Sequence, residues 1–334
     1  MPLPASLHGK LALPAIAAPM FLVSGPELVV AACRAGVVGT FPALNQRSSE
    51  GFEEWLASIG DALRAAEAGR AGIDRAPPVA PYGVNLIVHR SNPRVQTDLE
   101  LCVRHRVPLV ITSLGAVADL VQAVHRYGGL VFHDVTTLRH AEKAAEAGVD
   151  GLILVCAGAG GHAGTLSPFA LLPEVRRFFK GTIVLAGALT DGRSIAAARL
   201  LGADLAYLGT RFIATRESMA PPEYKQMILD GAAADIVYTP AISGIPGSFL
   251  RSSVRAAGLD PDDLPAKPGG YKAKAGGEGG GSHTAESEAK VWKTVWSAGQ
   301  GVGAIADIPS VTDLVARLRR EYADAKAAFL SDPY

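Results

Sequence analysis

The sequence predicts an α/β fold, a closed (β/α)8 TIM barrel with a long insertion, or lid, after its eighth strand. Eight short apolar segments alternate with helical segments over the first 214 residues, and eight such units make up a barrel. The apolar segments are continuous, which indicates strands covered on both faces in a parallel sheet. No GxGxxG pattern follows the first segment, which disfavours the alternative, an open doubly wound sheet.

The strands and helices are expected in strict alternation. The expected strands are residues 13–20, 36–41, 82–87, 108–113, 130–135, 151–155, 182–187 and 204–210. The expected helices are residues 27–35, 51–68, 94–105, 117–127, 137–147, 168–179, a segment from Asp191 to residue 201, and 310–329. Ser24 and Asp191 are expected to be N-caps, with Pro26 in the first turn after Ser24.

Length and composition fit a protein with a large hydrophobic core. The chain has 334 residues, of which 49% are hydrophobic, and its 32 basic and 32 acidic residues give no net charge. This balance gives no indication of a nucleic-acid or membrane partner, and it is compatible with a monomer or a homodimer. Three separated cysteines with apolar neighbours and no apparent signal peptide predict buried, reduced thiols in a cytoplasmic protein.

Two domains are expected. Residues 1–214 and 306–334 would form the barrel, and residues 215–305 an insertion that covers the catalytic end as a lid. The glycine-rich stretch 269–281 within the insertion reads as a mobile loop.

A glycine-rich loop with one histidine follows the sixth expected strand. It runs from Cys156 to Thr165 and contains His162. Such loops bring backbone N–H groups close to an anion, but an anion cradle does not need a histidine. We therefore expect the glycines to shape a pocket floor and His162 to act on what the pocket holds; the alternative is a glycine turn with a solvated histidine.

The ends of the last two strands favour a phosphate-bearing ligand. Ala186-Gly187 and Gly209-Thr210 end strands seven and eight, where barrels hold phosphate on tight turns. The expected mouth has no paired carboxylates and no Ser/His/Asp set, and His133, Asp134 and His162 do not form a convincing metal site. A mouth poor in ionisable groups suits a cofactor that carries the chemistry itself.

Six motifs, in order along the chain, resemble those of the nitronate monooxygenase (2-nitropropane dioxygenase-like) family. They are residues 18–20 (Ala-Pro-Met), 83–86 (Gly-Val-Asn-Leu), 160–164 (Gly-Gly-His-Ala-Gly), 191–193 (Asp-Gly-Arg), 208–212 (Leu-Gly-Thr-Arg-Phe) and 296–300 (Trp-Ser-Ala-Gly-Gln). Flavin-dependent enoyl-ACP reductases and NADH:quinone reductases of the same superfamily are similar at these motifs. The resemblance implies an FMN-binding TIM barrel without a metal.

The resemblance also implies residue roles. The backbone of Ala18, Pro19 and Met20 would lie beside the isoalloxazine, with an N–H donor near N5. Ala186, Gly187, Gly209 and Thr210 would hold the phosphate, Gly158 and Gly160 would let the backbone approach the cofactor, and Asn85, Ser113, Ser297 and Gln300 would complete the cofactor site.

His162 matches the catalytic histidine of the family. Its imidazole would take an α-proton from a nitroalkane or bind a nitronate, and FMN and O2 would convert the nitronate to a carbonyl compound and nitrite. The alternative function is an NAD(P)H-dependent flavin reductase acting on quinones or enoyl thioesters. A non-catalytic flavin barrel and a flavin-free phosphosugar isomerase-like barrel also remain open.

One position departs from the family pattern. Some relatives carry a lysine after the histidine of strand five, where this chain has Asp134 after His133. An acid there would oppose a reduced, anionic flavin unless it is paired, and His133 is the candidate for compensation.

Overall fold

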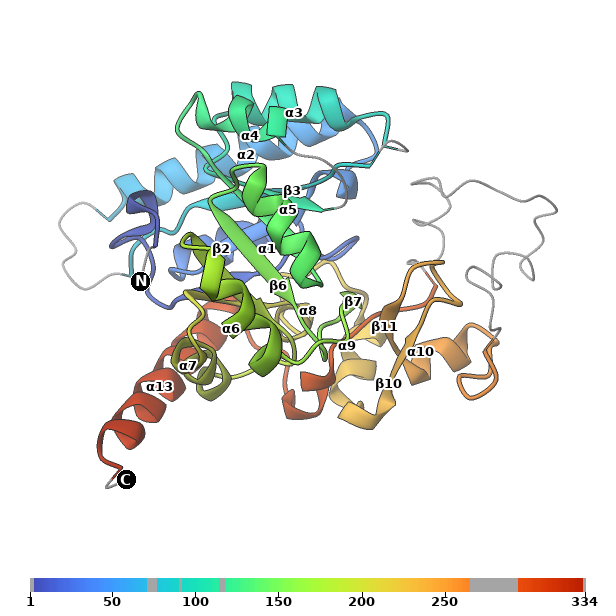
Figure 1. Ribbon diagram of the computed structural model, residues 1–334. Coiled ribbons are helices and arrows are strands. Elements are labelled where there is room, and N and C mark those ends of the chain that lie inside the picture. The colour runs from blue at the N-terminus through green and yellow to red at the C-terminus, as the bar shows by residue number, and fades with distance from the viewer. Residues whose placement is uncertain (1–2, 71–76, 90–91, 114–117, 265–293, 333–334) are drawn as a thin grey trace.

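The computed structural model describes residues 3–70, 77–89, 92–113, 118–264 and 294–332. In this part of the chain, eight parallel strands close into a barrel in the order β1-β2-β3-β4-β5-β6-β8-β9, and β9 pairs back onto β1 (Figure 1). Their bounds are β1 Ala15–Ala17, β2 Val38–Pro42, β3 Tyr82–Ile87, β4 Leu109–Ser113, β5 Leu130–Val135, β6 Gly151–Val155, β8 Thr182–Ala186 and β9 Leu205–Leu208. The predicted barrel is confirmed.

Helices follow the strands as the alternating pattern predicts. Their bounds are α1 Pro26–Arg34, α2 Ser49–Ala68, α3 Val95–Arg104, α4 Ala118–His125, α5 Leu138–Glu146, α6 Pro168–Phe178, α7 Gly192–Leu201, α8 Thr210–Ile213, α9 Pro222–Leu229, α10 Arg251–Ala256 and α13 Val311–Leu330. Short 3-10 turns are η1 Ala5–Leu7, η2 Ala43–Asn45, η3 Ala233–Asp235 and η4 Gln300–Ala304.

Of the two predicted N-caps, one is confirmed and one is wrong. The Asp191 side chain accepts a hydrogen bond from the Ser194 amide at 2.7 Å and caps α7. The N-cap of α1 is Gly25, because Pro26 already occupies the first turn. Ser24 lies one residue too early, and its hydroxyl instead accepts a hydrogen bond from the Met20 amide at 3.0 Å.

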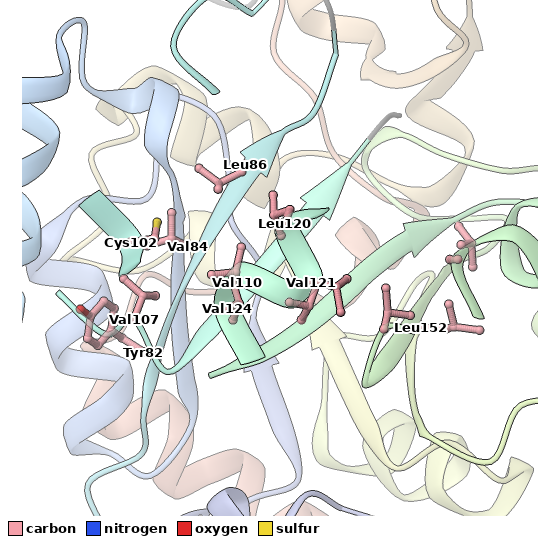
Figure 2. Packing of buried hydrophobic residues seen from close by; sticks show 14 of the residues in the cluster. Tyr82, Val84, Leu86, Cys102, Val107, Val110, Leu120, Val121, Val124 and Leu152 are labelled. Carbon is pink, nitrogen blue, oxygen red and sulfur yellow. The ribbon is translucent and has the colours of Figure 1, made fainter. Parts of the chain in front are cut away.

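The barrel separates two hydrophobic layers. Ile16, Ile111, Phe132, Ile153 and Val184 pack inside it, while the opposite faces of the strands pack against the helices. Figure 2 shows this outer layer, where strand side chains such as Val110 lie close to Leu120, Val121 and Val124 of α4. Each fully buried aliphatic side chain contributes roughly 1.5–3 kcal/mol to folding, so the barrel wall is a rigid support for residues at its rim.

A long insertion leaves the barrel after α8, and the chain returns at α13. Within it, β10 (Ile236–Thr239) and β11 (Gly247–Leu250) pair antiparallel. The third strand of this small sheet is β7 (Gly161–His162), which belongs to the glycine-rich loop after β6. Figure 1 shows β10, β11 and β7 together on one side of the barrel.

The carboxyl-terminal helix α13 packs against the outside of the barrel. Its residues Val311, Leu314 and Leu318 pack into one cluster with residues of α1 and α7. The division into a barrel domain (1–214 and 306–334) and a lid (215–305) stays a prediction, and the glycine-rich stretch 269–281 lies outside the described residues.

All three cysteines are buried and unpaired, as expected. Burial raises the pKa of the Cys33 thiol to about 12. Among the described helices, none has both the length and the apolar character that crossing a bilayer requires.

Candidate active site

A cavity of about 940 Å³ opens at the carboxyl ends of the barrel strands. This is the end at which TIM barrels build their sites. The cavity is lined by strand ends, by the turns after β6, β8 and β9, and by a segment of the insertion that includes Trp296 and Ser297. Its volume lies near the upper end of the usual range for small-molecule sites.

The cavity floor is formed by side chains that lie two residues further along each strand than those of the barrel interior. Alternate residues of a strand face the same side. Ile111 and Phe132 belong to the interior cluster, so Ser113 and Asp134 follow them on the same face. Seven side chains at this level line the cavity: Ala18, Asn85, Ser113, Asp134, Val155, Ala186 and Tyr207.

Three polar side chains of this layer form a hydrogen-bonded relay. Asn85 Nδ2 donates to Ser113 Oγ at 2.8 Å, and Ser113 Oγ donates to Asp134 Oδ2 at 2.5 Å. Asp134 Oδ1 is buried without a hydrogen-bond partner among the described residues. Burial raises the pKa of Asp134 to about 6, although the Ser113 hydrogen bond opposes the shift.

The segment from Ala18 to Met20 forms one wall but does not offer the expected N–H donor. The Ala18 amide donates to Leu208 O at 2.9 Å and the Met20 amide to Ser24 Oγ at 3.0 Å, and proline has no N–H. The expectation of an N–H donor from this segment is therefore wrong. The side chain of Asn45 fixes the segment by donating to Met20 O at 3.1 Å, a role that the sequence did not reveal.

Glycines shape the turns after β6 and β8. Gly158 and Gly187 have φ angles of +87° and +138°, which favour glycine. A Cβ on Gly187 would lie 2.7 Å from Ala157 O, and one on Gly160 would lie 2.9 Å from Gly299 N. These two turns therefore pack backbone against backbone. At Gly209, in contrast, a Cβ would meet no atom among the described residues closer than Ala18 Cβ, at 3.8 Å.

His162 lies at the cavity rim on β7 rather than in an irregular loop. The His162 backbone pairs with Gly247 of β11, so a strand of the insertion fixes the position of the histidine. His162 Nε2 lies 3.3 Å from Ser243 Oγ. Burial lowers the pKa of His162 to about 4, which keeps the imidazole neutral at neutral pH.

The segment around Ser297 folds back over the same loop. Ser297 Oγ accepts a hydrogen bond from the Gly161 amide at 2.6 Å and donates to Ser248 O at 2.6 Å. Trp296 stacks on Tyr224 with ring centroids 4.9 Å apart. The bond from Gly161 to Ser297 thus ties the insertion to the barrel mouth, while the other two contacts join parts of the insertion to one another.

A second histidine lines the cavity from a different setting. His133 follows Phe132 on β5 and therefore faces the helix layer, where Thr112 Oγ1 lies 2.7 Å from its Nδ1. Burial lowers the pKa of His133 to about 4, with a smaller contribution from His140. His140 and Lys143 of α5 line this side of the cavity.

Nearly all of the predicted site residues meet at this cavity. His162, Ala18, Pro19, Met20, Asn85, Ser113, Gly158, Gly160, Ala186, Gly187, Gly209, Thr210 and Ser297 line it. Gln300 is exposed and does not belong to the lining of the described cavity, but its amide donates to Gly158 O at 2.9 Å. Within the described residues, no group of His, Cys, Asp and Glu side chains could hold a metal ion.

Sequence reasoning missed several residues of the cavity. Tyr207 lines it from β9, and a hydroxyl inside an otherwise apolar strand was the signal that could have found it. Trp296 and Tyr224 also line it, but their pairing joins segments far apart in the chain, which no local pattern reveals.

Comparison with known proteins places these features in a family. A family model described as nitronate monooxygenase matches residues 76–321. A nitronate monooxygenase of Paraburkholderia phytofirmans is 28% identical over 92% of each chain. A (3aS,4S,5R,7aS)-5-hydroxy-7a-methyl-1-oxo-octahydro-1H-indene-4-carboxyl-CoA dehydrogenase of Mycobacterium tuberculosis is 28% identical over 72% of this chain and 64% of that protein.

A solved structure described as nitroalkane oxidase from Streptomyces ansochromogenes has a TM-score of 0.77 at 24% identity, covering 97% of this chain and 100% of that chain. This likeness shows a common fold. The chain spans between 48% and 64% of the length of the first curated relatives that it matches. Because the family model matches well over half of its residues, the chain belongs to the nitronate monooxygenase family.

Proposed function

We propose that this chain is a flavin-dependent oxidoreductase that binds FMN and oxidises alkyl nitronates with O2 to a carbonyl compound and nitrite. The observation that carries the proposal is the position of His162, a neutral imidazole at the rim of a cavity walled by glycine-rich turns. A bound flavin would supply the redox chemistry by accepting electrons from the substrate and passing them to O2.

The polar relay of the floor supports a flavin. The unpartnered Oδ1 of Asp134 calls for a ligand that carries a polar group, since a buried polar atom without a partner is costly. The pyrimidine ring of a flavin presents both an N–H and carbonyl oxygens. Asn85, Ser113 and Asp134 would therefore hold this polar edge, and the apolar side chain of Met20 would lie against the rest of the ring system.

The turns after β8 and β9 support FMN in particular. Ala186, Gly187, Gly209 and Thr210 line the cavity at these strand ends, the usual phosphate position of TIM barrels. The space at Gly209 is what a close approach of phosphate to backbone requires. Gly158, Gly160 and Ser297 would close the other side, and Gln300 would contribute through its backbone support of Gly158.

His162 would accept the substrate proton and bind the anion that results. A neutral imidazole accepts the α-proton of a nitroalkane, and the resulting imidazolium donates a hydrogen bond to the anionic nitronate. The buried setting that lowers the pKa of His162 also excludes water. The attraction between a bound nitronate anion and the protonated ring would therefore be stronger than in water.

A second candidate function is reduction or oxidation of a thioester substrate by an NAD(P)H-linked flavoenzyme. The observation that favours it is the similarity to a relative whose name gives a carboxyl-CoA substrate. The apolar lining from Val23, Ile213 and Trp296 would also accept a larger hydrophobic substrate than a small nitronate.

Anaerobic mixing of the purified protein distinguishes the two functions. The visible spectrum first shows whether a flavin is present. Bleaching of the flavin by propyl-2-nitronate, but not by NADH or NADPH, is expected; bleaching by a pyridine nucleotide alone would support the second function. Colourless protein that fails to take up FMN would overturn both.

A further inference from the structure

We infer that Asp134 is a redox-linked proton acceptor, which binds a proton from solvent when the flavin proposed for this cavity is reduced and releases it when the flavin is reoxidised. The inference deepens the proposed function: it rests on the presence of a flavin, but not on the identity of the substrate. It follows from the position of the Asp134 carboxyl in the cavity floor and from the side chains around it.

The side chain of Asp134 belongs to the cavity floor. It lines the cavity, two residues beyond Phe132 of the barrel interior. Its Oδ2 accepts a hydrogen bond from Ser113 Oγ at 2.5 Å, and Ser113 Oγ in turn accepts one from Asn85 Nδ2 at 2.8 Å. Its Oδ1 is enclosed and has no hydrogen-bond donor among the described residues, so a proton can bind to that oxygen without displacing a donor.

The charge of this carboxyl is not compensated by a cation in the described part of the chain. Burial raises the pKa of Asp134 to about 6 against the Ser113 hydrogen bond, and no charged neighbour contributes to the shift. His133 does not compensate it, because adjacent residues of a strand point to opposite faces and His133 Nδ1 lies 2.7 Å from Thr112 Oγ1. Burial also lowers the pKa of His133 to about 4, so its ring is neutral at neutral pH.

The other titratable groups on the surrounding elements do not change this balance. The neighbouring strands β4 and β6 carry none, and Asp119 and His125 of α4 are exposed. The remaining titratable side chains of the cavity lining are His140, Lys143 and Glu146 of α5, His162 of β7, Tyr207 of β9 and Tyr224 of α9. The three on α5 are exposed. The other three are neutral at neutral pH, because burial lowers the pKa of His162 to about 4 and raises the pKa of both tyrosines.

A second negative charge in this cavity would favour the protonated form of Asp134. The floor already transmits charge: burial raises the pKa of Tyr207 well above its usual value, and the Asp134 carboxylate adds to that shift. Reduction of FMN brings two electrons and one proton to the ring system and leaves it with one additional negative charge. A like charge raises the pKa of a carboxyl group, so Asp134 takes up a second proton from solvent. Reoxidation removes both electrons, and Asp134 returns its proton to solvent.

The first test is the pH dependence of the flavin midpoint potential, titrated anaerobically with dithionite and reference dyes on the FMN-loaded protein. Each proton bound per two electrons changes the equilibrium constant tenfold per pH unit, which is about 30 mV. Between pH 7 and pH 9 the unmodified protein should bind two protons, and Asp134→Asn, which retains an acceptor for Ser113, only one. Because pH 8 lies about two units above the Asp134 pKa of about 6, reduction of the variant should be about a hundredfold more favourable there, or about 60 mV. Parallel curves for the two proteins would overturn the inference.

Two further variants sharpen this titration. Glu146→Gln is the matched control, because Glu146 is a second carboxyl of the cavity lining but is exposed on α5; it should retain the two-proton slope. Ser113→Ala removes the hydrogen bond that lowers the pKa of Asp134 and leaves the carboxyl in place. The pH at which the slope changes should therefore move upward in Ser113→Ala, and an unchanged break would count against Asp134 as the proton acceptor.

The second test detects the proton directly. The infrared difference spectrum between the reduced and oxidised protein at pH 8 should contain the carbonyl stretch of a protonated carboxylic acid, which shifts in heavy water and is missing in Asp134→Asn. A spectrum of the unmodified protein without this band would reject the inference. Neither test needs a nitronate, so protein that passes both but does not oxidise nitronates would reject the proposed function alone. Protein that cannot be loaded with FMN would reject both.

Discussion

Two of the histidines that line the cavity, His133 and His162, are both buried but lie on different elements, and the comparison between them separates burial from chemical role. Burial lowers the pKa of both His133 and His162 to about 4. His133 is part of the barrel wall and shares a hydrogen bond with Thr112 of the neighbouring strand. His162 belongs to β7 in the glycine-rich loop, which pairs with β11 of the insertion, and it contacts Ser243. A depressed pKa therefore does not distinguish the two rings, and the proposal that His162 is the base rests on the element that carries it.

Replacement of His162 should give the largest effect. His162→Asn is expected to lower kcat/KM for a neutral nitroalkane by roughly 10²–10⁴-fold, the usual contribution of a general base, while flavin absorbance is retained. Steady-state kinetics on the flavin-loaded enzyme check this. An equal loss in His133→Asn would remove the distinction drawn between the two histidines.

The unfolding free energy should fall at acid pH because both His133 and His162 become protonated. A histidine whose pKa falls from 6.5 to about 4 on folding stabilises the protein above pH 6.5, and this contribution is lost as pH falls toward 4. Each shift corresponds to roughly 3 kcal/mol. His133→Gln should therefore reduce the loss of unfolding free energy between pH 7 and pH 4.5, measured by urea titration. An identical pH dependence in the variant would show that His133 titrates normally.

Asp134 should have the opposite pH dependence. Its pKa rises from 3.8 to about 6 on folding, so its stabilising contribution is present below pH 3.8 and lost as pH rises through 6. Asp134→Asn, which retains an acceptor for Ser113, should raise the unfolding free energy of the flavin-free protein at pH 8 by up to about 3 kcal/mol and leave it unchanged at pH 3.5. A gain that is equal at both pH values would contradict this origin.

Two glycines should separate packing from cofactor binding. Gly160→Ala places a Cβ 2.9 Å from Gly299 N and should lower the unfolding free energy by about 1–3 kcal/mol, as overpacking does. Gly209→Ala has no such close contact among the described residues, so it should keep the melting temperature of the flavin-free protein and weaken FMN binding. Fluorescence titration with FMN and thermal unfolding measure the two effects. Tight FMN binding by Gly209→Ala would argue against a phosphate at this turn.

The local patterns of the sequence predict the barrel well because each strand is a short apolar run in a parallel sheet. The Asp191 cap follows from side-chain chemistry at a helix start in the same way. The Ser24 cap failed because Pro26 shifts the helix start and the Ser24 hydroxyl is used by Met20. Local pattern alone cannot choose between residues that can cap neighbouring positions.

The site residues also fall into those that a local pattern predicts and those that depend on contacts between distant segments. Strand ends such as Ser113 and Ala186 were found because a barrel brings all strand ends to one mouth. The two-residue strand of His162 and its partner Gly247 are too short and too distant in sequence to leave a periodic signal. The hydrogen-bonded relay through Asp134 was also hidden, because its direction depends on which face of β5 each residue occupies.

The pairing of β7 with β11 couples the insertion to the proposed catalytic histidine. Changes in residues 236–250 can displace the imidazole relative to the barrel without altering any barrel residue. Variation in this segment is therefore expected to change which carbon acids the proposed base reaches, while the barrel itself stays the same.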